Sequence, residues 1–257
     1  MADAVIFGCK GMLARALAAE LAGRGISFVG RDLPECDLTK AGDVEVVFSE
    51  VRPRVVYNCA AFTKVDLCEQ QEELANAVNG HAVGTLAEMA KKYGAKLIHI
   101  STDFVFDGNG RTPYRPDDKP APLSAYGRSK LLGEQALQQT NPPGWAILRT
   151  AWLYGVGGPS FPRTMVEVAR QGKPLRVVDD QRGCPTYTVD LAKAMVAVAQ
   201  ADVSGIFHCT NSEPTTWYEF ARETLEQFKV PADLSPISSE QYKQMRPDSA
   251  HRPSYSV

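Results

Sequence analysis

The sequence predicts an α/β protein with a doubly wound parallel sheet and a smaller lobe toward its C-terminal end. Short apolar runs alternate with segments of helical periodicity up to residue 155, which is the pattern of consecutive strand–helix units. The first apolar run ends in a glycine-rich turn that opens a helix. Beyond residue 155 the alternation loosens, and residues 231–253 are rich in Pro and Ser. These observations separate a regular sheet-forming unit from a second, less regular one.

Composition and charge narrow the function classes. The chain has 257 residues, and its 44% hydrophobic and 23% charged residues are typical of globular proteins. The net charge is −2 without a basic block, so we expect neither nucleic acid nor a membrane surface as a partner. We also expect no signal peptide and no membrane span. Six scattered cysteines without a Cys-x-x-Cys pair favour free thiols in a reducing cytoplasm.

The first strand–helix unit predicts a phosphate-binding turn. An apolar strand over residues 4–7 is followed by Gly8, Gly11 and the small residue Ala14, and then by a helix with leucines at spacing four. Gly8 allows a tight turn, Gly11 lets the backbone approach a pyrophosphate, and Ala14 lets the helix pack on the strand. The helix N-terminus supplies free N–H groups for the phosphates. A plain structural turn is the alternative.

The end of the second strand bears on the choice of cofactor. The strand covers residues 26–30, and Arg31 and Asp32 follow it. NAD-binding units usually place an acidic residue here to hold the ribose 2′-OH, whereas an arginine can pair with the 2′-phosphate of NADP. We therefore expect NADPH, with Asp32 keeping NADH as an alternative. A solvated surface arginine is the other interpretation of Arg31.

The alternation continues through the next units. We expect further strands over residues 55–61 and 97–100, and helices over residues 44–51, over 72–93 and from Tyr126 onward. Sequential units of this kind form a parallel sheet with right-handed crossovers, and ligands bind at the carboxyl ends of its strands. Gly8, Arg31, Ala61 and Thr102 all fall at predicted strand ends. Their convergence favours a Rossmann-like, dinucleotide-binding sheet.

A candidate catalytic set spans Thr102 to Lys130. Tyr126 and Lys130 stand four residues apart, so they share one face of the predicted helix. A lysine cation close by favours the phenolate, so we expect Lys130 to lower the pKa of Tyr126 toward the range of a general acid. Thr102 can donate a hydrogen bond to the same carbonyl oxygen that Tyr126 protonates. The Tyr-x-x-x-Lys spacing alone also occurs by chance on any helix.

Longer blocks of the sequence resemble the extended short-chain dehydrogenase/reductases, and within them the dTDP-4-dehydrorhamnose reductase branch. The blocks typical of that branch are Ser101–Gly108, Ser-Thr-Asp-Phe-Val-Phe-Asp-Gly, and Arg149–Gly155, Arg-Thr-Ala-Trp-Leu-Tyr-Gly. Further matches are Asn58–Asp66, Asp180–Thr186 and Arg252-Pro253. The glycine turn and Tyr-x-x-x-Lys belong to the whole superfamily. The resemblance covers nearly the whole chain.

The resemblance implies a role for each matching residue. The implied cofactor-binding residues are Gly8, Lys10, Gly11, Met12, Leu13, Arg31, Asp37, Leu38, Ala60, Ala61, Phe62, Thr63, Tyr126 and Lys130. The implied catalytic residues are Thr102, Tyr126 and Lys130, and the implied substrate-binding residues are Thr102, Asp103, Tyr126 and Trp152. Asn79 is implied as a structural and proton-relay residue. For Trp152 a core position, for Asp103 a turn and for Asn79 a purely structural role are the alternatives.

The later part of the chain is expected to bind the substrate. We expect helices over residues 161–170 and 190–201, strands over 175–178 and 206–209, and a hydroxyl-capped helix starting near Trp217. Residues 1–155, with elements from 175–209, would form the NAD(P)-binding domain, and 156–257 mainly the substrate lobe. Arg182, Arg246 and Arg252 could meet a diphosphate, although a surface position is the alternative for each.

The resemblance implies an NAD(P)H-dependent reductase that converts the C4 ketone of dTDP-4-dehydro-L-rhamnose to dTDP-L-rhamnose. It also implies a nucleotide-diphosphate sugar as partner and a homodimer as one option. We expect no metal, because the first helix reads Ala14-Arg15-Ala16 where some relatives carry acidic ligands. Relatives continue with another helix past the segment matching Arg252–Val257, so truncation is a further alternative.

Two rival functions stay open at this point. One is another nucleotide-sugar enzyme of the superfamily, an epimerase or a dehydratase; a dehydratase would carry an acidic pair beside Thr102, where this chain has only Asp103 followed by Phe104. The other is a non-catalytic NADP-binding regulatory subunit of methionine adenosyltransferase. The presence of Thr102, Tyr126 and Lys130 favours the enzyme.

Overall fold

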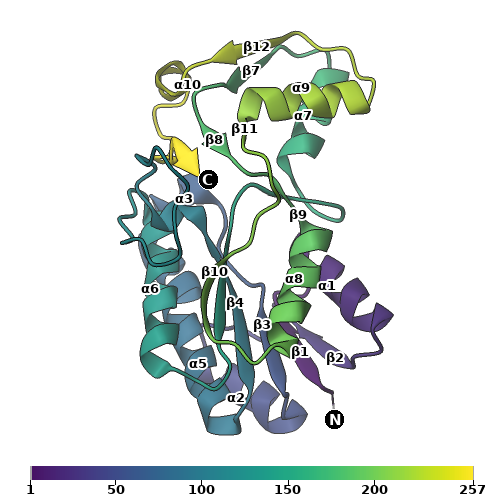
Figure 1. Ribbon diagram of the computed structural model, residues 1–257, viewed down its shortest axis with the longest axis vertical. Coiled ribbons are helices and arrows are strands. Elements are labelled where there is room, and N and C mark those ends of the chain that lie inside the picture. The colour runs from purple at the N-terminus through teal and green to yellow at the C-terminus, as the bar shows by residue number, and fades with distance from the viewer. Residues whose placement is uncertain (1, 257) are drawn as a thin grey trace.

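A computed structural model describes residues 2–256 and confirms the expected fold class. Six parallel strands form the central sheet in the order β10-β5-β4-β3-β1-β2 (Figure 1). The strands are β1 Ala4–Phe7, β2 Phe28–Arg31, β3 Val55–Asn58, β4 Lys96–Thr102, β5 Ala146–Thr150 and β10 Gly205–His208. Strand β2 lies on one side of β1, and β3, β4, β5 and β10 follow on the other side. The ligand crevice of such a sheet lies at this switch, beyond the carboxyl ends of the strands.

Helices cover both faces of the sheet because successive residues of each strand point to opposite sides. Val5 and Phe7 of β1 join one buried cluster, whereas Ala4 and Ile6 join the other. The first cluster includes helices α2 Ala41–Val51, α5 Ala82–Tyr93 and α6 Ala125–Thr140, and the second includes α1 Met12–Gly23 and α8 Thr188–Gln200. The sheet is therefore buried on both faces and holds the strand ends rigidly.

The long helix expected over residues 72–93 is interrupted. It consists of α4 Glu72–Asn76, a π-helical turn Ala77–His81, and α5. Gly80 in this turn lies against the side chain of Leu132 in α6, and Gly133 of α6 lies against the backbone oxygen of Asn79. A side chain at either glycine would collide with the facing helix, so the pair of glycines sets their close approach. The single-helix prediction missed this turn.

A smaller lobe lies beyond the strand ends, at the top of Figure 1. Its core contains residues of α7 Phe161–Arg170, β7 Leu175–Val178 and α9 Trp217–Gln227, with β12 Leu234–Ile237 packed beside them. A three-stranded sheet joins β8 Arg182–Gly183, β11 Thr215–Thr216 and β13 Tyr255–Ser256. The remaining elements are α3 Val65–Cys68, a 3-10 turn Asp103–Val105, β6 Leu153–Tyr154, β9 Thr186–Tyr187 and α10 Ser239–Met245.

The segment 175–209 is divided between the two regions. Helix α8 packs on α1 and strand β10 pairs with β5, so both belong to the central layers. Strand β7 instead pairs with β12 in the small lobe, although the sequence assigned it to the sheet-forming unit. The hydroxyl cap of α9 is as expected, because Thr216 accepts a hydrogen bond from the Glu219 N–H at 3.1 Å. Among residues 2–256, no helix is long and apolar enough to cross a membrane.

Candidate active site

The turn after β1 forms a cradle of backbone. Gly8 has φ +75°, and a Cβ there would lie 2.6 Å from the backbone nitrogen of Ala60. Only glycine fits both the left-handed backbone and this close contact. Helix α1 begins after Gly11, and its first turn has no side-chain cap and no acidic residue. Its N–H groups and partial positive charge therefore face the crevice, an arrangement that fits a pyrophosphate.

Two cavities meet at this cradle and share Gly11, Cys59, Ala60 and Ala61. One of about 240 Å³ lies over the ends of β1 and β2 and includes Gly8, Arg31, Asp37 and Leu38 in its lining. The other, of about 430 Å³, includes Met12, Leu13, Thr63, Thr102, Asp103, Tyr126, Lys130 and Trp152. Together they form one crevice, with the smaller chamber over the ends of β1 and β2 and the candidate catalytic residues in the larger one.

The chamber over β2 is lined by Asp32 and Arg31, which differ in their hydrogen bonds. The two oxygens of Asp32 accept hydrogen bonds from the N–H groups of Lys10 at 2.9 Å and Leu33 at 2.8 Å. Among residues 2–256, Arg31 donates only to the adjacent Gly30 carbonyl, at 3.0 Å. The Asp32 carboxylate therefore stabilises the turn, and the Arg31 guanidinium remains available for a 2′-phosphate. The Lys10 ammonium contacts the Leu33 carbonyl and Glu35, and Lys10 lines neither cavity.

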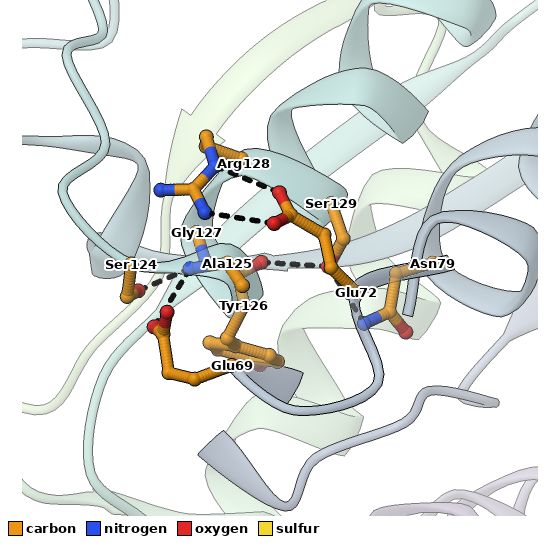
Figure 2. A network of polar contacts seen from close by, with 9 residues as sticks. All are labelled: Glu69, Glu72, Asn79, Ser124, Ala125, Tyr126, Gly127, Arg128 and Ser129. Atoms are coloured by element: carbon orange, nitrogen blue, oxygen red, sulfur yellow. Dashed lines mark hydrogen bonds and ion pairs between the residues drawn. The ribbon is translucent and has the colours of Figure 1, made fainter. Parts of the chain in front are cut away.

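Helix α6 presents Tyr126 in a first turn that is held from several sides (Figure 2). The Ser124 hydroxyl caps the helix by accepting from the Gly127 N–H at 3.1 Å, and Glu69 accepts from the Ala125 N–H at 2.9 Å. Arg128 of the same turn forms a two-pronged ion pair with Glu72 at 2.9 and 3.1 Å. These contacts fix the start of the helix and therefore the position of the phenol.

Asn79 of the π-helical turn ties this helix to the loop after β3. Its side-chain oxygen accepts from the Phe62 N–H at 2.8 Å, and its nitrogen donates to the Phe62 carbonyl at 3.1 Å and the Ser129 hydroxyl at 3.0 Å. Ser129 in turn donates to the Tyr126 carbonyl at 2.8 Å. Asn79 lines neither cavity, so its observed contacts fit the structural alternative; the proton-relay role stays a prediction.

The electrostatics of Tyr126 differ from the sequence-based expectation. Burial raises the pKa of Tyr126, the charge of Asp103 adds to this, and a hydrogen bond with Thr102 opposes it. We expected Lys130 to lower this pKa, and that prediction was wrong for the chain by itself. The Lys130 ammonium instead donates to the Ile100 carbonyl at 2.6 Å. The phenol therefore stays protonated at neutral pH, which is the form a proton donor needs.

Lys130 is itself strongly affected by burial. Only 2% of it is exposed, and this burial lowers its pKa to about 8 against the opposing charges of Glu134 and Cys59. Its Nζ lies 3.3 Å from Nε2 of the buried His99, whose Nδ1 lies 3.0 Å from the amide nitrogen of Asn58. The sequence offered no sign that His99 lies behind the lysine.

Three buried polar atoms line the catalytic end without a hydrogen-bond partner in the described chain. They are Ser101 Oγ, Asp103 Oδ2 and Thr150 Oγ1, at the ends of β4 and β5. Burial raises the pKa of Asp103, while the Thr102 hydroxyl, 2.9 Å away, donates to its other oxygen. Unpaired buried polar atoms are costly, so their gathering here indicates a polar ligand. Sequence reasoning missed Ser101 and Thr150, although both stand at strand ends.

Trp152 forms a wall of the same cavity. Its backbone is left-handed, with φ 49°, which is uncommon for a bulky residue. Its ring stacks on Trp217 of the small lobe with 3.6 Å between centroids and an interplanar angle of 14°. Gly183 lies against the edge of the Trp152 indole, because a Cβ added at Gly183 would lie 2.5 Å from Trp152 Cε2. The indole is thus fixed from two sides, and its strained backbone is of the kind found at binding sites.

The structure brings most of the expected site residues together. The expected catalytic, cofactor-binding and substrate-binding residues all line one of the two cavities except Lys10 and Phe62. Phe62 instead packs against the small buried cluster of Cys68, Ala75 and Ala125. None of the three arginines considered for a diphosphate lines either cavity. Arg252 pairs with Asp66 at 2.9 Å, and neither Arg182 nor Arg246 lines the catalytic cavity. Among residues 2–256, no cluster of three potential metal ligands occurs.

The parallel sheet, the glycine cradle and the Thr102–Tyr126–Lys130 set define a nucleotide-binding oxidoreductase of the short-chain dehydrogenase type. The family model described as RmlD substrate binding domain matches residues 2–257, and the chain belongs to this family. A dTDP-4-dehydrorhamnose reductase of Streptomyces griseus is 40% identical over 98% of this chain and 84% of its own. A probable dTDP-4,6-dihydroxy-2-methyloxan-3-one 4-ketoreductase of Streptomyces antibioticus is 42% identical over 98% and 85%.

Solved structures agree with this assignment. The dTDP-4-dehydrorhamnose reductase of Clostridium acetobutylicum has a TM-score of 0.94 at 39% identity, covering 99% of this chain and 89% of that one. The Bacillus anthracis enzyme in complex with NADP also has a TM-score of 0.94, at 33% identity, covering 100% and 90%. A UDP-glucose 4-epimerase from Thermus thermophilus, 22% identical with a TM-score of 0.80, shares the fold.

Proposed function

We propose that this protein uses NADPH to reduce the C4 ketone of dTDP-4-dehydro-L-rhamnose, giving dTDP-L-rhamnose. One observation carries the proposal: Thr102, Tyr126 and Lys130 meet at one end of a crevice whose other end is a backbone cradle for a dinucleotide. The names of relatives at 40% and 39% identity supply the substrate. NADPH is favoured because Arg31 is available at the end of β2 and Asp32 is engaged.

The crevice would hold the cofactor along its full length. Gly8, Gly11 and the first turn of α1 would bind the pyrophosphate, Arg31 the 2′-phosphate, and Asp37 with Leu38 the adenosine end. Ala60, Ala61 and Thr63 leave room for the nicotinamide end, and Lys130 would reach its ribose. When bound, the cofactor supplies a hydride. Lys10 and Phe62 line neither cavity, so their place in the proposed set rests on the family resemblance alone.

The chain's own residues then handle the proton. Thr102 would turn its hydroxyl from Asp103 to the ketone oxygen, donate a hydrogen bond there and steady the negative charge that develops. Tyr126, protonated because it is buried, gives its proton to that oxygen as the alcohol forms. Proton donation by a positioned acid typically contributes about 10²–10⁴-fold to a rate. Cofactor and substrate that fill the cavity would displace its water, which strengthens each of these interactions.

The small lobe, mainly residues 156–257, is proposed to bind the nucleotide sugar. Trp152 would pack against the hexose ring, held there by Trp217. The unpaired oxygens of Ser101, Asp103 and Thr150 would meet its hydroxyl groups. The assignment of residues 1–155 to the cofactor stays part of the same proposal, with α8 and β10 added to it by the observed sheet.

A related 4-keto sugar is the second candidate substrate. The relative at 42% identity is named for a different dTDP-linked ketone, and another at 40% identity is a dTDP-4-keto-6-deoxy-D-glucose reductase. The same catalytic residues would serve any of these sugars, and specificity would depend on the walls around Trp152. A regulatory, non-catalytic role is less favoured because Thr102, Tyr126 and Lys130 all line the cavity.

The test is oxidation of NADPH with dTDP-4-dehydro-L-rhamnose generated in place from dTDP-glucose by a dehydratase and an epimerase. We expect turnover that falls by about 10²-fold or more in Tyr126→Phe. Tyr93→Phe is the matched control, because this ring packs on Phe48 and lines neither cavity. Near-normal turnover in Tyr126→Phe would refute the mechanism. Turnover with dTDP-4-keto-6-deoxy-D-glucose, and none with dTDP-4-dehydro-L-rhamnose, would favour the second candidate substrate.

We also propose a cytoplasmic location and a homodimeric assembly. The six cysteines are all free, which suits a reducing cytoplasm. The homodimer rests on the family resemblance, and light scattering of the purified protein would test it.

A further inference from the structure

A buried chain of polar groups runs behind the catalytic lysine. It starts at the Ala60 N–H, passes through the side chains of Asn58 and His99, and ends at Nζ of Lys130. Asn58, His99 and Lys130 are 1%, 0% and 2% exposed, so water does not compete for these contacts. None of the roles proposed above uses Asn58 or His99.

The first link fixes the orientation of the Asn58 amide. The Ala60 N–H lies 3.1 Å from Asn58 Oδ1 and can only donate. Turning the amide over would set two donors against each other in a buried place, at the cost of a lost hydrogen bond. The oxygen of Asn58 therefore faces Ala60, and its NH₂ group faces His99.

The second link fixes the tautomer of His99. The Asn58 NH₂ donates to His99 Nδ1 over 3.0 Å, so Nδ1 carries no proton. Burial and the nearby Lys130 hold the pKa of His99 well below its usual range, so the ring is neutral. A neutral ring with a bare Nδ1 carries its proton on Nε2. This Nε2–H points at Lys130 Nζ, 3.3 Å away.

We propose that His99 is a positioning residue whose Nε2–H favours the neutral amine of Lys130 over its ammonium. An ammonium at Nζ offers only donors, so it opposes the facing N–H. When Nζ releases its proton, the lone pair left behind accepts the hydrogen bond from Nε2. One of the two remaining N–H groups keeps the bond to the Ile100 carbonyl. His99 thereby makes the Lys130 proton easier to release.

The use of this arrangement rests on the proposed reduction, in which Tyr126 loses a proton at every turnover. A neighbouring lysine that releases its proton near neutral pH suits replacement of that proton. The other groups that face Lys130 have the opposite effect. Glu134 on α6 and Cys59 after β3 both favour the ammonium, although Glu134 is already paired with Arg149 at 2.7 Å. His99 is the donor that faces Nζ from β4.

The tautomer can be observed without substrate or cofactor. The chain has four histidines, so ¹⁵N-labelled histidine gives a simple two-dimensional spectrum, and the His99 signals are those lost in His99→Gln. We expect His99 to be neutral with its proton on Nε2 throughout the range in which the protein is folded. A proton on Nδ1, or an imidazolium near neutral pH, would overturn the proposal. The tautomer itself is read from the unmodified protein, and the variant serves only to assign the signals.

The second measurement follows Lys130 itself. In His99→Gln the side-chain amide can turn its oxygen toward Nζ, so we expect Lys130 to hold its proton about tenfold more tightly. The Cε resonance of Lys130, assigned by its loss in Lys130→Met, reports this as an upward move of its titration midpoint by about one pH unit. If His99 instead accepted a bond from the ammonium, the Gln oxygen would replace it and the midpoint would stay unchanged, which would refute the proposal.

The kinetic readout separates this inference from the proposed function. The basic limb of the pH profile of kcat/KM should move in the same direction in His99→Gln, and exposed His81→Gln should leave it in place. An unmoved limb beside a shifted Lys130 midpoint would overturn the link to catalysis. Failure of the proposed sugar to react would contradict the proposed function only, because the tautomer and the Lys130 titration are measured without it.

Discussion

The buried lysine makes a quantitative prediction about stability. In the folded protein the pKa of Lys130 is about 8, against an ordinary value of 10.5 that it regains on unfolding. Between these values the unfolded chain binds a proton that the folded chain does not, so stability rises with pH across this window. Below pH 8 the folded protein carries the full free-energy cost of the buried Lys130 ammonium. At about 1.36 kcal/mol for each tenfold change in proton affinity, it amounts to about 3 kcal/mol.

Lys130→Met removes this titration, so comparison with the variant measures its contribution to the free energy of unfolding. We expect the free energy of unfolding of the natural protein, relative to that of the variant, to rise by about 2–3 kcal/mol between pH 7 and pH 10. Urea unfolding at several pH values measures both proteins, and the other titrating groups cancel in the difference. The variant also loses the hydrogen bond to the Ile100 carbonyl, which changes the difference in unfolding free energy by the same amount at every pH and so leaves its slope unchanged. Exposed Lys173→Met is the control and should show no such slope. If the difference in unfolding free energy between the natural protein and Lys130→Met did not change with pH, the cost of burying the ammonium would be fully offset by its contacts, and the prediction would be wrong.

Three further substitutions probe other parts of the site. Arg31→Ala should weaken NADPH binding about 10- to 100-fold and leave NADH nearly unchanged, which calorimetry with both cofactors would reveal; equal losses would contradict the 2′-phosphate role. Arg149→Met leaves Glu134 buried without its cation and should cost about 3–5 kcal/mol in urea unfolding, with most of it regained when Glu134→Leu is added. Gly183→Ala places a methyl group against Trp152 and should raise KM for the sugar without changing NADPH affinity; an unchanged KM would remove Trp152 from the substrate wall.

Much of the fold and the crevice could be predicted because their signals are local. The strand at residues 4–7, the glycine turn and the helix that follows are each written in consecutive residues, and the structure has them where expected. Expected residues that gather at the cavities lie at the ends of such elements, which a parallel sheet brings to one edge. The strand 175–178 was found, yet its partner β12 is far along the chain, so its sheet could not be predicted.

What the sequence could not provide depends on close packing between distant segments. The π-helical turn arises where Gly80 meets Leu132 across two helices, and no helical periodicity encodes that contact. The proposed role of His99 depends on its contacts with Asn58 and Lys130, and these three residues come from three different elements. Ser101 and Thr150 stand out only because the finished fold leaves their oxygens buried and unpaired.

Burial acts in opposite senses on the two ionisable partners of the site. It raises the pKa of the Tyr126 phenol and lowers that of the Lys130 ammonium, since each loses stability in its charged form. The pair therefore favours a neutral phenol beside an amine that is easily deprotonated, rather than a phenolate–ammonium ion pair. Ketone reduction starts from a protonated phenol, whereas oxidation of the alcohol starts from a phenolate. The packing around α6 consequently prepares the site for the reductive direction at neutral pH, before any cofactor charge is added.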